Sequence, residues 1–108
     1  MAIEKKFKIL IYPGLHTRPG AKFVQLCSKF DSDIEILFED KVANGKSMIN
    51  IMTMAAPQNA EITIKVNGSD EDILLKELTE WHTEAHKSKE DFDNFPDKHE
   101  ILKVFEII

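Results

Sequence analysis

The sequence changes from a strand pattern to a helix pattern across a single Pro-Gly pair, and this change constrains the fold of the N-terminal third. Residues 7–12 are mainly β-branched and aromatic, and their alternation places Phe7, Ile9 and Ile11 on one face of a strand. Pro13-Gly14 ends that pattern. Beyond it, apolar residues recur at helical spacing: Gly20, Phe23, Val24, Cys27 and Phe30. The chain therefore predicts a strand, a tight turn and an amphipathic helix in succession.

His16 lies at the start of the predicted helix. Pro19 is compatible only with a first helical turn, so the helix begins at about His16 or Thr17. A helix start presents unpaired backbone N–H groups and the positive end of the helix dipole, and both favour an anion. Arg18 adds a planar cationic donor two residues further on. This arrangement suits a side chain that carries an anion for a short time, although a surface histidine that only caps a helix would show the same spacing.

The remaining pattern predicts a small α+β domain. Alternating apolar residues indicate strands at residues 34–39 and 61–66, and a short strand at residues 41–43 forms a hairpin with the first of these. Ser47 is a plausible cap for a short helix that ends near residue 54. Residues 69–72 have the pattern of a capping box. The helix that they begin carries an apolar side: Ile73, Leu74, Leu78 and Trp81.

The predicted order is thus β-α-β-β-α-β-α. An open, four-stranded, largely antiparallel sheet with three helices on one face is the simplest way to bury these apolar faces. Its 108 residues, 43% of them hydrophobic, suffice for one compact core.

Composition argues against several classes of function. No apolar run approaches the length of a membrane span and no signal-peptide pattern occurs, so we expect a soluble, cytoplasmic protein without membrane insertion. The net charge of −5 argues against nucleic acid as a partner. We expect no metal and no cofactor, because the chain has neither a Walker-type loop nor a zinc-binding Cys/His spacing. Cys27 is predicted to be a small buried side chain without a redox role.

The short helix after Ser47 is a second candidate site. Its spacing places three apolar side chains on a face that we expect to be an exposed docking patch: Met48, Ile49 and Met52. Ile51 and Met54 should point inward. Phosphorylation of Ser47 would add about −1.5 to −2 charges beside the patch, which would disturb an apolar or acidic partner surface. A simple helix cap is the alternative role for Ser47.

Two segments resemble motifs of one family. Residues 14–19, Gly-Leu-His-Thr-Arg-Pro, resemble the active-site motif of HPr, the histidine-containing phosphocarrier of the bacterial sugar phosphotransferase system. Residues 44–52, Asn-Gly-Lys-Ser-Met-Ile-Asn-Ile-Met, resemble the regulatory-serine motif of the same family. The two segments lie at the family's separation, and the resemblance implies an open-faced β-sandwich. Thr17 stands where alanine is more usual and Gly20 where a small apolar residue is common, but neither change removes a group that phosphoryl transfer needs.

The resemblance implies a covalent phosphoryl carrier rather than an enzyme. His16 would accept a phosphoryl group from phosphoenzyme I and pass it to an enzyme IIA component for sugar uptake. Arg18 would stabilise the phosphate, and Thr17 would contact the partners. Ser47 would be phosphorylated by HPr kinase/phosphorylase. The resemblance also implies a transcriptional regulator as a further partner. The alternative is a regulatory module that is controlled at Ser47 and has no role in sugar transport; the presence of both His16 and Arg18 favours the carrier.

The chain continues beyond the usual end of this family. We therefore expect an HPr-like domain at residues 1–85 and an atypical C-terminal extension at residues 86–108. Phe95-Pro96-Asp97 has a helix-start pattern. Four apolar residues after it share one helical face: Ile101, Leu102, Phe105 and Ile108.

So much apolar surface is unusual in a solvated tail. We expect the extension to cover part of the open sheet face, toward which Leu10, Tyr12 and Leu37 point, or to mediate self-association. His82 and His86 are spaced i,i+4 on the predicted third helix. Without a third ligand they do not predict a metal site, and an exposed helical face is the simpler interpretation.

Overall fold

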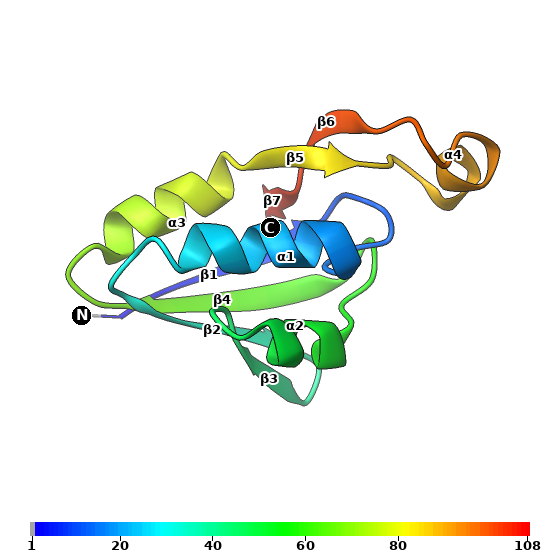
Figure 1. The fold of residues 1–108 in the computed structure, drawn as a ribbon. Coiled ribbons are helices and arrows are strands. Elements are labelled where there is room, and N and C mark those ends of the chain that lie inside the picture. Colours follow the sequence, from blue (N-terminus) through cyan, green and yellow to red (C-terminus); the bar gives the residue numbers. More distant parts are fainter. Residues whose placement is uncertain (1) are drawn as a thin grey trace.

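The computed structural model describes residues 2–108 and contains an antiparallel sheet with helices packed on one face (Figure 1). Its elements follow in the order β1 (Ile3–Ile9), α1 (Thr17–Cys27), β2 (Asp33–Phe38), β3 (Lys41–Asn44), α2 (Met48–Met54), β4 (Glu61–Asn67), α3 (Glu71–Thr79), β5 (His82–Ala85), α4 (Lys89–Asn94), β6 (Glu100–Lys103) and β7 (Phe105–Ile107). Among these residues, no helix is both long and apolar enough to cross a membrane.

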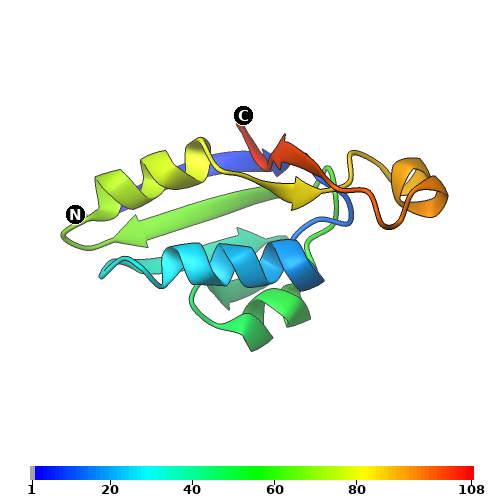
Figure 2. The ribbon, with the colours of Figure 1, turned by 45° about the horizontal axis from the view of Figure 1, so that its top comes forward.

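The main sheet has the strand order β3-β2-β4-β1-β7, and every neighbouring pair of strands is antiparallel. Its first four strands, with α1, α2 and α3, confirm the predicted α+β open-faced sandwich. Figure 2 shows the three helices on the same side of the sheet. The fifth strand, β7, comes from the C-terminal extension and lies along the outer edge of β1, where Phe7 pairs with Ile107 and Ile9 with Phe105.

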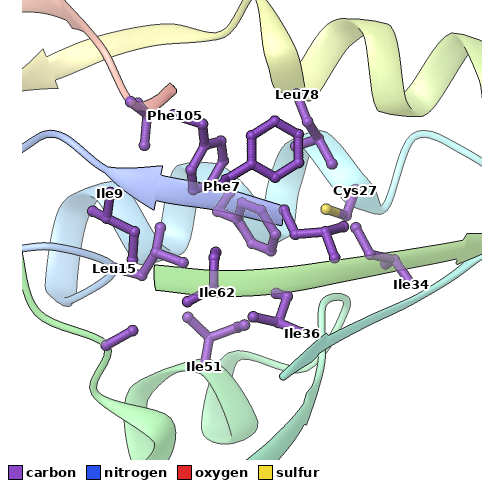
Figure 3. Close-up of a cluster of buried hydrophobic side chains, with 14 of the residues drawn as sticks. Phe7, Ile9, Leu15, Cys27, Ile34, Ile36, Ile51, Ile62, Leu78 and Phe105 are labelled. Atoms are coloured by element: carbon purple, nitrogen blue, oxygen red, sulfur yellow. The ribbon is translucent and has the colours of Figure 1, made fainter. Parts of the chain in front are cut away.

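Alternation along the strands explains the core. The odd-numbered residues Phe7 and Ile9 of β1 are fully buried, as are the inward-facing residues of β2 and β4. Figure 3 shows these side chains meeting those of the helices between the sheet and α1. Cys27 is buried in this cluster, as the sequence predicts, and burial raises the pKa of its thiol to about 12.

The third helix ends earlier than its pattern predicts. α3 stops at Thr79, and the chain continues as β5, which pairs with β6. Trp81 lies at this change of direction: its ring contacts Phe23 at 5.9 Å and Phe105 at 5.8 Å between centroids, and its carbonyl accepts a hydrogen bond from the N–H of Val104. Packing against the extension therefore overrides the local helical spacing, and the predicted helical pair of His82 and His86 is wrong.

The extension is also folded differently from the prediction. Its helix, α4, precedes Phe95-Pro96-Asp97. After that segment Ile101 and Leu102 lie in β6 and Phe105 lies in β7, rather than in a helix, and Ile108 directly follows β7. The unpaired edge of β1 provides backbone donors and acceptors for a further strand, and β7 pairs with it. Phe105 lies on the helix side of the sheet, against Phe23 of α1. β7 thus extends the sheet at its edge and does not cover the open face, although such covering is one of the roles that the sequence predicts for the extension.

The capping box predicted at residues 69–72 is replaced by a longer-range contact. Asp70 occupies the N-cap position of α3 but makes no side-chain capping bond. Its carboxylate instead accepts hydrogen bonds from the backbone N–H groups of Asp31 and Ser32, each at 2.9 Å, and from the Ser32 hydroxyl. Asp70 therefore ties the start of α3 to the loop between α1 and β2. The bond from the Ser32 hydroxyl, followed by the bond from the Asp31 N–H, lowers the pKa of Asp70.

Candidate functional site

His16 occupies the N-cap position of α1, as the sequence predicts. Its backbone is extended (φ −115°, ψ 160°), its side chain makes no capping bond, and the residue is half-buried. The first helical hydrogen bond runs from the Gly20 N–H to the His16 carbonyl at 3.1 Å. The helix itself therefore leaves the N–H groups of Thr17 and Arg18 without an acceptor, and these donors lie at the positive end of the dipole.

The loop before His16 is held firmly against the segment that follows α2. Leu15 is fully buried, and its N–H donates to the Ala56 carbonyl at 3.0 Å. Gly14 has φ +109°, and a Cβ there would collide with the backbone of Ala56 and Pro57. Only glycine fits this close approach. The loop geometry fixes the position of the imidazole at the helix start.

Thr17 and Arg18 follow His16 on the surface. Thr17 is exposed and has φ +38°, which is uncommon for a residue with a β-branched side chain. Arg18 is exposed as well, and its Nη1 lies 3.7 Å from Oε2 of Glu84. The two side chains are 60% and 58% exposed, so the pair contributes at most about 1 kcal/mol and can open readily. Sequence reasoning missed Glu84, because it placed that residue near the end of a helix rather than on β5.

Ser47 occupies the N-cap position of α2. Its hydroxyl accepts a hydrogen bond from the Asn50 N–H at 3.2 Å, which is the predicted capping role. Met48 and Ile49 are 39% and 77% exposed, as expected for a docking patch. Met52 is less exposed than the prediction requires.

Met52 is half-buried and packs against the core, because α2 lies directly on α1. Its methyl group occupies the space that a side chain at Gly20 would fill, and a Cβ at Gly20 would also lie 3.4 Å from Ile51. Gly20 therefore permits the close approach of the two helices. Figure 2 shows α2 beside the start of α1, so the helix that Ser47 caps lies next to the helix that His16 begins.

Ile51 and Met54 point inward as predicted, with exposures of 0% and 1%. No group of three or more potential metal-ligating side chains occurs among residues 2–108. The site that the fold assembles is therefore a half-buried imidazole at a helix start, flanked by an exposed guanidinium and by a capped second helix.

Comparison with known proteins matches this sequence to one family. A family profile described as "PTS HPr component phosphorylation site" matches residues 3–84. The phosphocarrier protein HPr of Buchnera aphidicola subsp. Baizongia pistaciae is 39% identical over 80 residues, which cover 74% of this chain and 94% of that protein.

Solved structures agree with this match. HPr of Bacillus anthracis is 36% identical with a TM-score of 0.68, and the alignment covers 69% of this chain and 89% of that one. HPr-C-His of Thermoanaerobacter tengcongensis is also 36% identical, with a TM-score of 0.67 and coverage of 68% and 83%. The profile match ends at residue 84, one residue before β5 does. The chain belongs to the HPr family, the phosphocarrier proteins of the phosphotransferase system.

Proposed function

We propose that this phosphocarrier acts in the cytoplasm, where it accepts a phosphoryl group from phosphoenzyme I on His16. It then passes the group to enzyme IIA components, which serve sugar uptake. The observation that carries the proposal is the position of His16 at the N-cap of α1, with its side chain not used for capping. The side chain is therefore available for chemistry, and the adjoining backbone donors can hold an anion.

The transfer would need little beyond positioning and charge. The lone pair of a neutral imidazole nitrogen forms the N–P bond while the bond between phosphorus and the donor breaks, and the second ring nitrogen keeps its proton. The donors at the start of α1 contribute about 0.3–2 kcal/mol to a nearby anion. This is enough to favour transfer without trapping the product. Arg18 would leave Glu84 and neutralise charge on the phosphoryl group in transit.

Incubation with enzyme I and phosphoenolpyruvate tests this proposal. The full chain should gain acid-labile phosphate, His16→Ala should gain none, and Ser47→Ala should gain as much as the wild type. If the wild type gains no phosphate, or if His16→Ala gains an equal amount, the carrier role of His16 is wrong.

We also propose that Ser47 is a regulatory site for HPr kinase/phosphorylase. Its hydroxyl lies at the edge of the exposed Met48 and Ile49 surface, so a phosphate there would change the charge at a docking surface without entering the core. The fold would tolerate the added charge, because it lies at a helix N-terminus. The kinase and ATP should give acid-stable phosphate in the wild type and none in Ser47→Ala, with His16→Ala as the matched control.

The competing function is a regulatory module that is controlled at Ser47 and takes no part in sugar transport, with a transcriptional regulator as its partner. The two assays separate these functions. Acid-stable phosphate at Ser47 without acid-labile phosphate at His16 would favour the module.

A further inference from the structure

A pocket of about 240 Å³ lies beside the start of α1, between that helix and the C-terminal extension. Tyr12, Pro19 and Phe92 contribute apolar walls, and the rings of Tyr12 and Phe92 lie 5.7 Å apart between centroids. Arg18 and Glu84 belong to the same lining. The phosphorylation-site helix supplies part of the pocket and the extension supplies the rest.

One lining residue has a buried polar atom without a partner. His86 is 3% exposed, and its Nδ1 lies 2.9 Å from Oδ2 of Asp91. Its Nε2 is buried and has no hydrogen-bond partner among residues 2–108. Such atoms are rare in folded proteins. In the tautomer that donates the Nδ1–H to the Asp91 carboxylate, Nε2 carries a lone pair, so a ligand would satisfy it by donating a hydrogen bond.

Two exposed charges of opposite sign complete the pocket. Arg18 and Glu84 lie 3.7 Å apart, and more than half of each side chain is exposed. A guanidinium binds a carboxylate well, and a carboxylate binds an ammonium group. The pair is therefore complementary to a zwitterion, in which the two charged groups are also adjacent.

From this geometry we propose that the pocket binds a free aromatic α-amino acid whose ring carries a hydrogen-bond donor. The ligand carboxylate contacts Arg18, its ammonium group contacts Glu84, its ring packs against Tyr12 and Phe92, and its ring O–H or N–H donates to Nε2 of His86. The volume is suitable, because a cavity of about 150 Å³ holds a benzene ring, and this pocket has room for a ring and a short polar chain.

Ligand binding would be coupled to phosphorylation, a consequence that rests on the proposed function of His16. The ligand carboxylate and a phosphoryl group on His16 would compete for the one guanidinium of Arg18. Each would weaken the other by the same factor, since coupling between two sites is reciprocal.

Calorimetric titration of the unphosphorylated full chain tests the site without enzyme I, so a negative result is independent of the carrier proposal. L-Tyrosine should bind at millimolar concentration or below. L-Phenylalanine, which lacks the ring donor, should bind about tenfold more weakly, the effect of one net hydrogen bond. Tyramine lacks the carboxylate and 3-(4-hydroxyphenyl)propionate lacks the ammonium group, so both should also bind more weakly. This series needs no variant.

Two variants assign the contacts. Glu84→Gln should weaken binding of L-tyrosine and leave 3-(4-hydroxyphenyl)propionate no weaker than in the wild type. His86→Phe should remove the preference for L-tyrosine over L-phenylalanine, and the ring resonances of Tyr12 and Phe92 should shift when L-tyrosine is added to the wild type. The proposal is overturned if L-tyrosine does not bind at millimolar concentration, or if it binds no better than L-phenylalanine.

Discussion

Nη1 of Arg18 and Oε2 of Glu84 lie 3.7 Å apart, and this ion pair joins α1 to β5. Arg18 lies within the segment that resembles the family's active-site motif, and Glu84 lies at the last residue of the family match. Under the proposed function, Glu84 would compete with a phosphoryl group on His16 for the Arg18 guanidinium.

Glu84→Gln should make His16 easier to phosphorylate. Removing the competing carboxylate frees Arg18, and an exposed pair of this kind is worth at most about 1 kcal/mol, so the equilibrium should shift by no more than about fivefold. Measurement of the equilibrium distribution of phosphate between enzyme I and each variant checks this. Glu90→Gln, an exposed acid on α4 with no ion pair to Arg18, is the matched control, and an equal effect of both variants would contradict a specific role for Glu84.

Phe105→Ala should destabilise the fold by about 3–5 kcal/mol, the usual cost of truncating a buried aromatic side chain. Phe105 is fully buried and contacts Phe7, Phe23 and Trp81. Ile107→Ala is the control on the same strand; Ile107 is 51% exposed, so its cost should be about 1 kcal/mol or less. Urea unfolding of the two variants measures both values. Similar costs would show that Phe105 is not a core residue.

Deletion of residues 87–108 should lower the melting temperature. The deletion removes β7 from the edge of β1 and removes Val104 and Phe105 from the core, so apolar surface on Phe23 and Trp81 becomes exposed. Calorimetry of the full and shortened chains, with size-exclusion chromatography of each, measures the effect. An unchanged melting temperature together with an unchanged oligomeric state would contradict a structural role for the extension.

Asp70→Asn should destabilise the protein at neutral pH and lose this effect in acid. The bonds from Ser32 and Asp31 lower the pKa of Asp70 below its ordinary value of 3.8, so the folded state is stabilised above that value. The stabilisation is lost as the pH falls through the lower folded-state pKa. Urea unfolding across this range should show the gap between wild type and variant closing in acid. Asp72→Asn, at an exposed acid in the first turn of α3, is the control, and an equal gap in this variant would contradict a specific role for the bonds from Asp31 and Ser32.

Most strands and helices of residues 3–79 were predictable because their apolar periodicity agrees with their environment. The first strand is an exception in its bounds: β1 spans Ile3–Ile9 rather than the predicted residues 7–12. β2, β4 and α1 each bury one face, so local pattern and tertiary packing indicate the same element. The N-cap positions of His16 and Ser47 followed for the same reason. These are local properties of the chain.

The C-terminal part was not predictable, because its conformation depends on distant partners. His82 and His86, and the apolar residues of 101–108, fit a helical spacing. The carbonyl of Trp81 nevertheless accepts a hydrogen bond from the N–H of Val104, and His82 pairs with Lys103. Asp70 likewise looked like a capping residue until its partners proved to be Asp31 and Ser32. Contacts between residues that are far apart in the sequence produce no periodic pattern of apolar residues from which they could be predicted. Met52 was misplaced because the close approach of α2 to Gly20 is a property of the packing.

The pairing of β7 with β1 brings Ile108 beside Lys6, since the N–H of Ile108 donates to the carbonyl of Lys6 at 3.1 Å. During synthesis β1 emerges long before β7 is made. The sheet edge at β1 therefore stays open until the residues of β7 have left the ribosome. A chain that lacks β7 would keep this edge exposed, which would distinguish it from a chain that carries β7 for chaperones and proteases.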